Sequence, residues 1–197
     1  MKFMHIMAPL LFAGVATAEQ IQSKPFHLLV RSKHRSLHNQ KLAACHSGAA
    51  TQSLCLTGDT GSMFYLNRTE GSQSPVKNLQ PAGKLIWNLP IQNGPVSLSM
   101  SFHVEPSSNV ALPLFEPSDI SQLVAFDKKD RLAILSYLDD TQKPPKSEAL
   151  VLKNWYACMT YYSGYRYQTL SWALGSKKIK PENPSCKKVK VERRFLL

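Results

Sequence analysis

Short hydrophobic segments separated by turn-forming residues recur along most of the chain. Apolar residues occupy every second position in several of them, as at Phe26, Leu28 and Val30. This period turns one face of a strand toward a core. We predict strands at residues 26–31, 54–56, 63–66, 85–87, 98–104, 110–115, 123–126, 132–138, 150–162, 167–174 and 189–195. Runs of this length with Gly, Pro, Asn or Ser between them are typical of an all-β protein.

Helical periodicity is weak throughout. The best helical candidates are the Ala-rich segment 42–53 and a turn at 118–123, where Ser118 and Asp119 are suitable caps. We therefore predict an all-β fold, a single compact antiparallel domain of about a dozen short strands. A β-trefoil-like barrel and a β-sandwich both accommodate that number. The strand count favours the trefoil, whereas the lack of a sharp internal repeat disfavours it. Both the trefoil-like barrel and the sandwich therefore remain open.

The first residues have the pattern of a secretory signal peptide. Lys2 gives a positive start, residues 6–15 are mainly apolar, and residues 16–18 are small, as cleavage requires. The apolar run is shorter than the ~20 residues that a membrane span needs. We expect residues 1–18 to be the signal peptide and residues 19–197 to form one secreted, extracellular domain with no transmembrane segment.

The four cysteines fit an oxidising compartment. Cys45, Cys55, Cys158 and Cys186 form no C-x-x-C pair, so the zinc-site and thioredoxin spacings are both absent. An even number of cysteines in a secreted chain predicts two disulfides. Three pairings are possible, and we favour Cys45–Cys55 with Cys158–Cys186 because each joins neighbours in the sequence.

One acceptable N-glycosylation sequon is present, Asn67-Arg68-Thr69. The other Asn-x-Ser sequence begins at Asn183 and has Pro in its middle position, which glycosylation does not accept. Asn67 follows an apolar run, which suits the exposed end of a strand. We predict Asn67 as a glycosylation site.

The chain is strongly basic. Its 24 Lys and Arg against 13 Asp and Glu give +11, and removing residues 1–18 with Lys2 leaves +10. Basic residues crowd the C-terminus, where Lys188, Lys190 and Arg194 lie on one face of the predicted last strand. This face is either a platform for anionic glycans, cell-wall polymers, lipid headgroups or nucleic acid, or a lysine-rich edge that prevents aggregation.

Aromatic residues are also clustered, between residues 155 and 172. Exposed aromatic rings beside polar groups can stack on sugars, because they have an apolar face and a polar edge. Large aromatics in strands are more often core residues, and we favour that interpretation for most of this group. Trp155 and Trp172 are nevertheless candidate binding residues, together with Lys188, Lys190 and Arg194.

Catalytic motifs are scarce. His46 lies beside Cys45, but a disulfide-bonded cysteine has no thiolate for nucleophilic catalysis. Asp139 and Asp140 open a Pro-rich loop, where a turn or cap role is favoured over glycoside hydrolysis. The sequence contains no G-x-S-x-G, G-x-G-x-x-G or P-loop motif.

No metal site or cofactor is predicted, and a nucleotide cofactor is not expected. His34 and His38 lie in a basic loop without a nearby carboxylate or an H-E-x-x-H pattern, so a solvated loop is favoured over metal binding.

Several motifs occur in order along nearly the whole mature chain. They include P-F-H-L-L-V at 25–30, C-H-S-G-A-A at 45–50, L-S-W-A-L-G at 170–175 and N-P-S-C at 183–186. Together they resemble a family of small secreted proteins of filamentous fungi. The resemblance implies a fungal source and one disulfide-bonded extracellular domain. It implies no activity and no functional residues, since none is assigned to that family.

These observations favour a non-enzymatic extracellular domain that binds a surface polymer, such as an anionic or cell-wall polysaccharide, or a host surface component. The alternative is a small basic secreted hydrolase, ribonuclease-like or a glycosidase, built around His46, His103 or Asp139. A structural surface protein with no dedicated ligand is a third possibility.

Overall fold

The structure is a computed structural model that describes residues 19–176 and 179–196, so the predicted signal peptide at 1–18 lies outside the described residues. Fifteen strands and one short 3-10 helix form, and no α-helix occurs in the described part of the chain. The all-β prediction is confirmed. The elements are β1 (Gln20–Gln22), β2 (Phe26–Arg31), η1 (Arg35–Leu37), β3 (Leu42–Gly48), β4 (Thr51–Leu56), β5 (Tyr65–Thr69), β6 (Gly83–Leu89), β7 (Val96–Val104), β8 (Val110–Glu116), β9 (Leu123–Phe126), β10 (Leu132–Ser136), β11 (Leu150–Leu152), β12 (Trp155–Tyr162), β13 (Tyr165–Ala173), β14 (Lys187–Lys188) and β15 (Lys190–Phe195).

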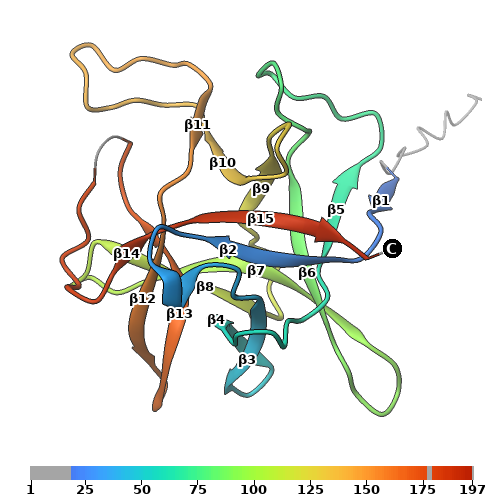
Figure 1. The fold of residues 1–197 in the computed structure, drawn as a ribbon. Helices are drawn as coiled ribbons and strands as arrows, with labels where there is room; N and C mark the ends of the chain where they lie inside the picture. The colour runs from blue at the N-terminus through green and yellow to red at the C-terminus, as the bar shows by residue number, and fades with distance from the viewer. Residues whose placement is uncertain (1–18, 177–178, 197) are drawn as a thin grey trace, which may run out of the picture.

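Thirteen strands form one antiparallel sheet that curls into a half-barrel (Figure 1). Its main path runs β11-β10-β9-β6-β7-β8-β4-β13-β12-β14, with β5 and β1 added beside β6 and β3 beside β4. The remaining two strands, β2 and β15, pair along their whole length and cross the face of the sheet as a ribbon. This single curled sheet is nearer to the barrel alternative than to a two-sheet sandwich.

The main hydrophobic core lies between the ribbon and the sheet. Alternate residues of β2 point into it, and Phe26, Leu28 and Val30 are fully buried, as their spacing predicts. From β15, Val191 is fully buried beside them. The ring of Phe26 packs edge-on against that of Phe126 at 5.6 Å between centroids. Strands β2 and β15, which come from near the two ends of the described chain, therefore share one core.

The helical prediction for residues 42–53 is wrong. The segment forms β3 and the start of β4, which pair antiparallel from Leu42↔Leu56 to Gly48↔Thr51. The alanines of β3 favour a helix only weakly, whereas pairing with β4 and burial of Leu42 fix a strand. The predicted strand at 150–162 is interrupted at 153–154, where β11 ends and β12 begins.

Both disulfides form as favoured. Cys45–Cys55 joins the neighbouring strands β3 and β4. Cys158–Cys186 joins β12 to the loop that precedes β14, across a sequence separation of 28. None of the helices in the described residues is long and apolar enough to cross a membrane.

The sequence context suggested that Asn67 lies at the exposed end of a strand, but the structure does not place it there. It lies within β5, paired with Gln22 of β1 on one side and with Lys84 of β6 on the other. Its side-chain oxygen accepts a hydrogen bond from Gln22 at 2.9 Å. Glycosylation of Asn67 stays a prediction.

Candidate anion-binding site

The last strand alternates between buried and exposed positions, as predicted. Val189 and Val191 are buried, whereas Lys188, Lys190 and Arg194 are exposed. The structure separates the three predicted basic residues, however. Lys188 and Lys190 line a cavity of about 680 Å³, whereas Arg194 lies farther along β15 and outside the lining.

This cavity, called the basic cavity below, is assembled from four separate parts of the chain. They are the end of β2 with the loop that follows it, the turn between β9 and β10, the link between β11 and β12, and the β14–β15 segment. Its lining consists of Arg31, Ser32, Lys33, His34, His38, Arg131, Lys153, Lys188, Val189 and Lys190. None of the described residues in this lining is Asp or Glu.

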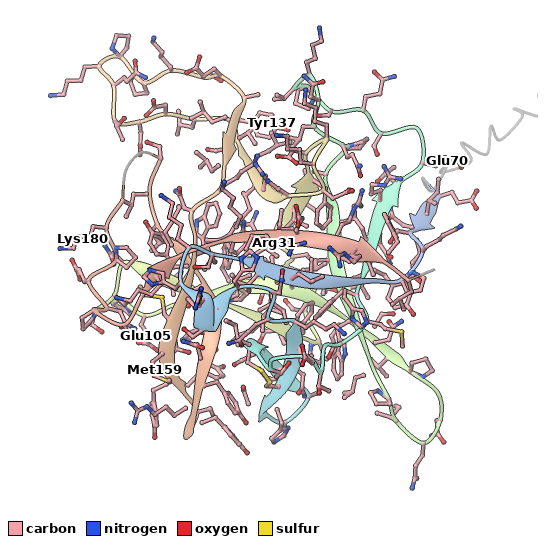
Figure 2. All side chains as sticks on the ribbon, in the orientation of Figure 1. Arg31, Glu70, Glu105, Tyr137, Met159 and Lys180 are labelled. Atoms are coloured by element: carbon pink, nitrogen blue, oxygen red, sulfur yellow. A yellow bond between two sulfur atoms is a disulfide. The ribbon has the colours of Figure 1, made fainter. Side chains whose placement is uncertain are left out.

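The loop after β2 is held closely against the ribbon. Asn39 donates its backbone N–H to the carbonyl of Val30 at 2.8 Å, and Leu37 is buried beneath the loop. Arg31, labelled near the middle of the ribbon in Figure 2, is ion-paired with Glu192 of β15 and donates to the side chain of Asn39. These contacts fix one wall of the basic cavity.

The β9–β10 turn supplies Arg131. Its backbone N–H donates to the carboxylate of Asp127 at 3.0 Å, and the same carboxylate is ion-paired with Lys153. Burial raises the pKa of Asp127, but the hydrogen bonds from Lys153, Arg131 and Lys129 outweigh that effect and hold the pKa below its usual 3.8. Asp127 is therefore charged at neutral pH and fixes two residues of the cavity wall.

Two contacts hold the side chain of Lys188. Its ammonium nitrogen donates to the carbonyl of Lys153 at 2.9 Å and lies 4.5 Å from the centroid of the Tyr156 ring. Partial burial lowers the pKa of Lys188 below its ordinary 10.5. The side chain remains cationic at neutral pH because a lysine pKa must fall by several units before its charge is lost.

The basic cavity carries excess positive charge. Six of its lining side chains are Lys or Arg, and two of these are ion-paired, Arg31 with Glu192 and Lys153 with Asp127. The other four are Lys33, Arg131, Lys188 and Lys190. None of them forms an ion pair with another described residue. Like charges placed this close repel one another, so an anionic ligand lowers the energy of the arrangement.

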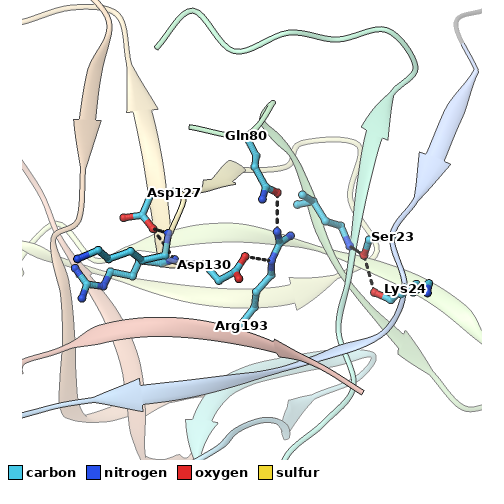
Figure 3. A network of polar contacts seen from close by, with 9 residues as sticks. Ser23, Lys24, Gln80, Asp127, Asp130 and Arg193 are labelled. Atoms are coloured by element: carbon cyan, nitrogen blue, oxygen red, sulfur yellow. Dashed lines mark hydrogen bonds and ion pairs between the residues drawn. The ribbon is translucent and has the colours of Figure 1, made fainter. Parts of the chain in front are cut away.

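Arg193, adjacent to Arg194, has a different role. Its side chain is only 6% exposed, its Nε donates to Asp130 at 2.9 Å, and its Nη2 donates to Gln80 at 2.6 Å (Figure 3). The guanidinium also lies 4.3 Å from the centroid of the Phe126 ring. Burial lowers the pKa of Arg193, and Asp130 opposes that shift. Arg193 thus attaches β15 to the β9–β10 turn.

Trp155 and Trp172 do not reach the surface. Trp155 is fully buried, and its indole N–H donates to the carbonyl of Leu132 at 3.0 Å. Trp172 is 5% exposed, and its ring packs against that of Trp155 at 4.7 Å. Both rings are core residues because their strands turn this face toward the ribbon. Neither presents a face for a sugar to stack on, so we leave both out of the binding surface.

The tyrosines of this region do reach the surface. Ser163 and Gly164 both have positive φ, the geometry of a tight two-residue hairpin turn between β12 and β13. Tyr162 and Tyr165 face each other across that turn, and Tyr161 is 74% exposed. This tyrosine hairpin is a second candidate surface, without the excess charge of the basic cavity.

Two of the candidate catalytic residues, His46 and His103, lie beside the tyrosine hairpin. The ring of His46 lies 5.3 Å from that of Tyr165, and the ring of His103 lies 4.9 Å from that of Tyr162. His103 Nε2 is also 3.0 Å from Glu105, which is labelled near Met159 in Figure 2. Both histidines therefore flank the tyrosine hairpin.

Asp139 lies elsewhere, in the loop between β10 and β11. It is fully buried and accepts hydrogen bonds from Thr141 and Gln142, which is the capping role that its Pro-rich context predicts. His34 and His38 both line the basic cavity. Within the described ranges, no group of three His, Cys, Asp or Glu residues is placed to hold a metal ion.

Sequence reasoning did not identify Arg31, Lys33, Arg131 or Lys153 as site residues. They lie far apart in the sequence and meet only through the crossing of the ribbon over the sheet. The basic loop at 31–41 was a signal for part of the site, but its charge alone is equally typical of a solvated loop.

Comparison with protein families identifies one match. A family model described as a domain of unknown function, DUF7907, matches residues 23–195, which include the ribbon, all of the sheet except β1, and the whole basic cavity. No curated protein and no solved structure matches the chain. Because the match covers most of the chain, the protein belongs to the DUF7907 family of domains of unknown function.

Proposed function

We propose that this chain is a secreted, extracellular binding domain of a filamentous fungus and that it holds an anionic polysaccharide in the basic cavity, without catalysing a reaction. The signal-peptide pattern at residues 1–18 and the resemblance to secreted fungal proteins support the location. The two disulfides are those of a protein that matures in an oxidising compartment.

One observation carries the proposal. Four cationic side chains without an acidic partner surround a single cavity, and no carboxylate of the described residues lines it. A lysine-rich edge that only prevents aggregation needs charges spread along an edge strand. It does not need unpaired cations from three separate parts of the chain around one cavity. Convergence of this kind is typical of anion recognition.

The position of the charges favours a polymer over a small anion. Lys33, His34 and Lys190 are exposed at the mouth of the cavity rather than enclosed within it. A chain that carries repeated negative charges can occupy the cavity and continue past it. Such a ligand releases counterions on binding, so its affinity falls as salt rises.

The test measures binding of a short heparin fragment by calorimetry at low and at physiological salt. We expect Lys190→Ala to weaken binding by about tenfold, equivalent to roughly 1.4 kcal/mol. Arg194→Ala removes an identical charge from the same strand outside the cavity, and we expect a change of less than about twofold. Equal losses in the two variants would mean that binding follows net charge alone, and no binding by the parent protein would refute the proposal.

A further inference from the structure

Arg131 is the one cation of the basic cavity whose buried donor lacks a partner. Its side-chain Nε is buried and has no hydrogen-bond partner in the described part of the chain. Its backbone is nevertheless fixed on both sides, since the N–H donates to Asp127 and the carbonyl accepts from Asp127 N–H at 3.0 Å. A buried donor without a partner calls for a structural reason, and the guanidinium to which it belongs lines the basic cavity.

The other cations without an ion pair come from different segments of the chain. Lys33 comes from the loop after β2, Lys188 from β14 and Lys190 from β15, whereas Arg131 comes from the β9–β10 turn. A carboxylate offers two oxygens in one plane, which suffices for one guanidinium fork. A sulfate or phosphate ester presents three non-bridging oxygens on different sides, and these can pair with the fork and with ammonium groups at the same time.

Resting on the function proposed above, we infer that the basic cavity binds the tetrahedral oxyanion of a sulfate or phosphate ester on a polysaccharide and that Arg131 is the residue that distinguishes it from a carboxylate. The planar guanidinium donates two parallel hydrogen bonds to two ester oxygens. Lys188 and Lys190 contribute point charges, which attract any anion and discriminate less.

The test compares three polymers with one negative group per sugar: polygalacturonate, which has carboxylates, a dextran sulfate, and a phosphorylated mannan. Binding to each is measured by calorimetry at one ionic strength. We expect at least one ester polymer to bind at least tenfold more tightly than polygalacturonate, and the tighter of the two identifies the ester. Equal affinity for polygalacturonate and both esters would overturn the inference while leaving the proposed function intact. Binding to none of the three would overturn both.

Arg131→Lys keeps the charge and removes the planar fork, so it tests the role of the residue itself. We expect the preference for the ester over polygalacturonate to fall at least fivefold, with a smaller change in affinity for polygalacturonate. Arg194→Lys is the matched control and should keep the preference of the parent protein. A urea unfolding curve checks that each variant is folded, and Arg131→Gln replaces Arg131→Lys if it is not. An unchanged preference in the folded variant would overturn the assignment of Arg131.

Discussion

The ammonium nitrogen of Lys188 lies 4.5 Å from the centroid of the Tyr156 ring and donates to the carbonyl of Lys153 at 2.9 Å. These two contacts hold the charge in the wall of the basic cavity, while partial burial lowers the pKa of the lysine. Desolvation of a charge opposes folding, and the two contacts offset that cost. The arrangement fits a lysine retained for its charge rather than for stability.

Lys188→Met should therefore separate stability from binding. We expect the free energy of unfolding to change by less than about 1 kcal/mol, because the lost cation–π contact is balanced by relief of desolvation. Heparin affinity should fall by about tenfold, as for Lys190→Ala. Urea unfolding and calorimetry measure the two quantities. A destabilised variant with full heparin affinity would show that Lys188 serves the fold instead.

Replacing Arg193 and replacing Arg194 should affect the stability of the fold to different extents. Arg193→Leu removes the buried contacts to Asp130 and Gln80, so we expect the free energy of unfolding to fall by about 1.5–3 kcal/mol. Arg194→Leu alters an exposed side chain and should change stability by less than about 0.5 kcal/mol. Urea denaturation of the two variants under identical conditions provides the comparison. Similar stabilities would contradict the role given to Arg193 in attaching β15.

The two disulfides should differ in their effect on stability. In the chain-entropy account, the loss on removal grows with the loop closed, and the sequence separations are 10 for Cys45–Cys55 and 28 for Cys158–Cys186. We expect losses of about 2.7 and about 3.6 kcal/mol for the paired Ala variants. Urea unfolding of each paired Ala variant, with its other disulfide intact, shows which variant loses more stability. A larger loss for the shorter loop would show that packing of β3 on β4 outweighs loop closure.

Asp127 should make stability depend on pH. Its pKa in the folded protein lies below the usual 3.8, so its contribution is fully present above that value and is lost as the pH falls through the folded pKa. Asp127→Asn should be less stable than the parent protein at about pH 7, and the difference should shrink as the pH falls below 3.8. Unfolding curves across this range provide the test, with Asp119→Asn at an exposed loop position as the control. A difference that does not vary with pH would contradict the ion pair with Lys153.

Much of the strand pattern could be predicted because burial alternates along single strands. In β2 the apolar residues recur at every second position, and Phe26, Leu28 and Val30 are buried as expected, as is Val191 of β15. The pattern failed in β3, where Ala43 and Ala44 carry little hydrophobic signal. Pairing with β4 decided the structure there, and pairing between segments does not appear in the local sequence.

The candidate site could be predicted only in part. Lys188 and Lys190 follow from strand alternation, which exposes them together with Arg194. Their separation from Arg194 depends on where the β9–β10 turn meets β15, as seen in the bridge between Arg131 and Glu192. Such a contact depends on how the ribbon crosses the sheet, so a charge pattern along one strand cannot reveal it.

The central claim is that an anionic polysaccharide occupies the basic cavity, and backbone amide shifts observed by NMR during titration with a heparin fragment test it most directly. The account predicts that the largest changes lie at Ser32, Lys33, Arg131, Val189 and Lys190, which line the cavity, and that they saturate together. Changes centred on the tyrosine hairpin, or small changes spread over every basic residue, would contradict it.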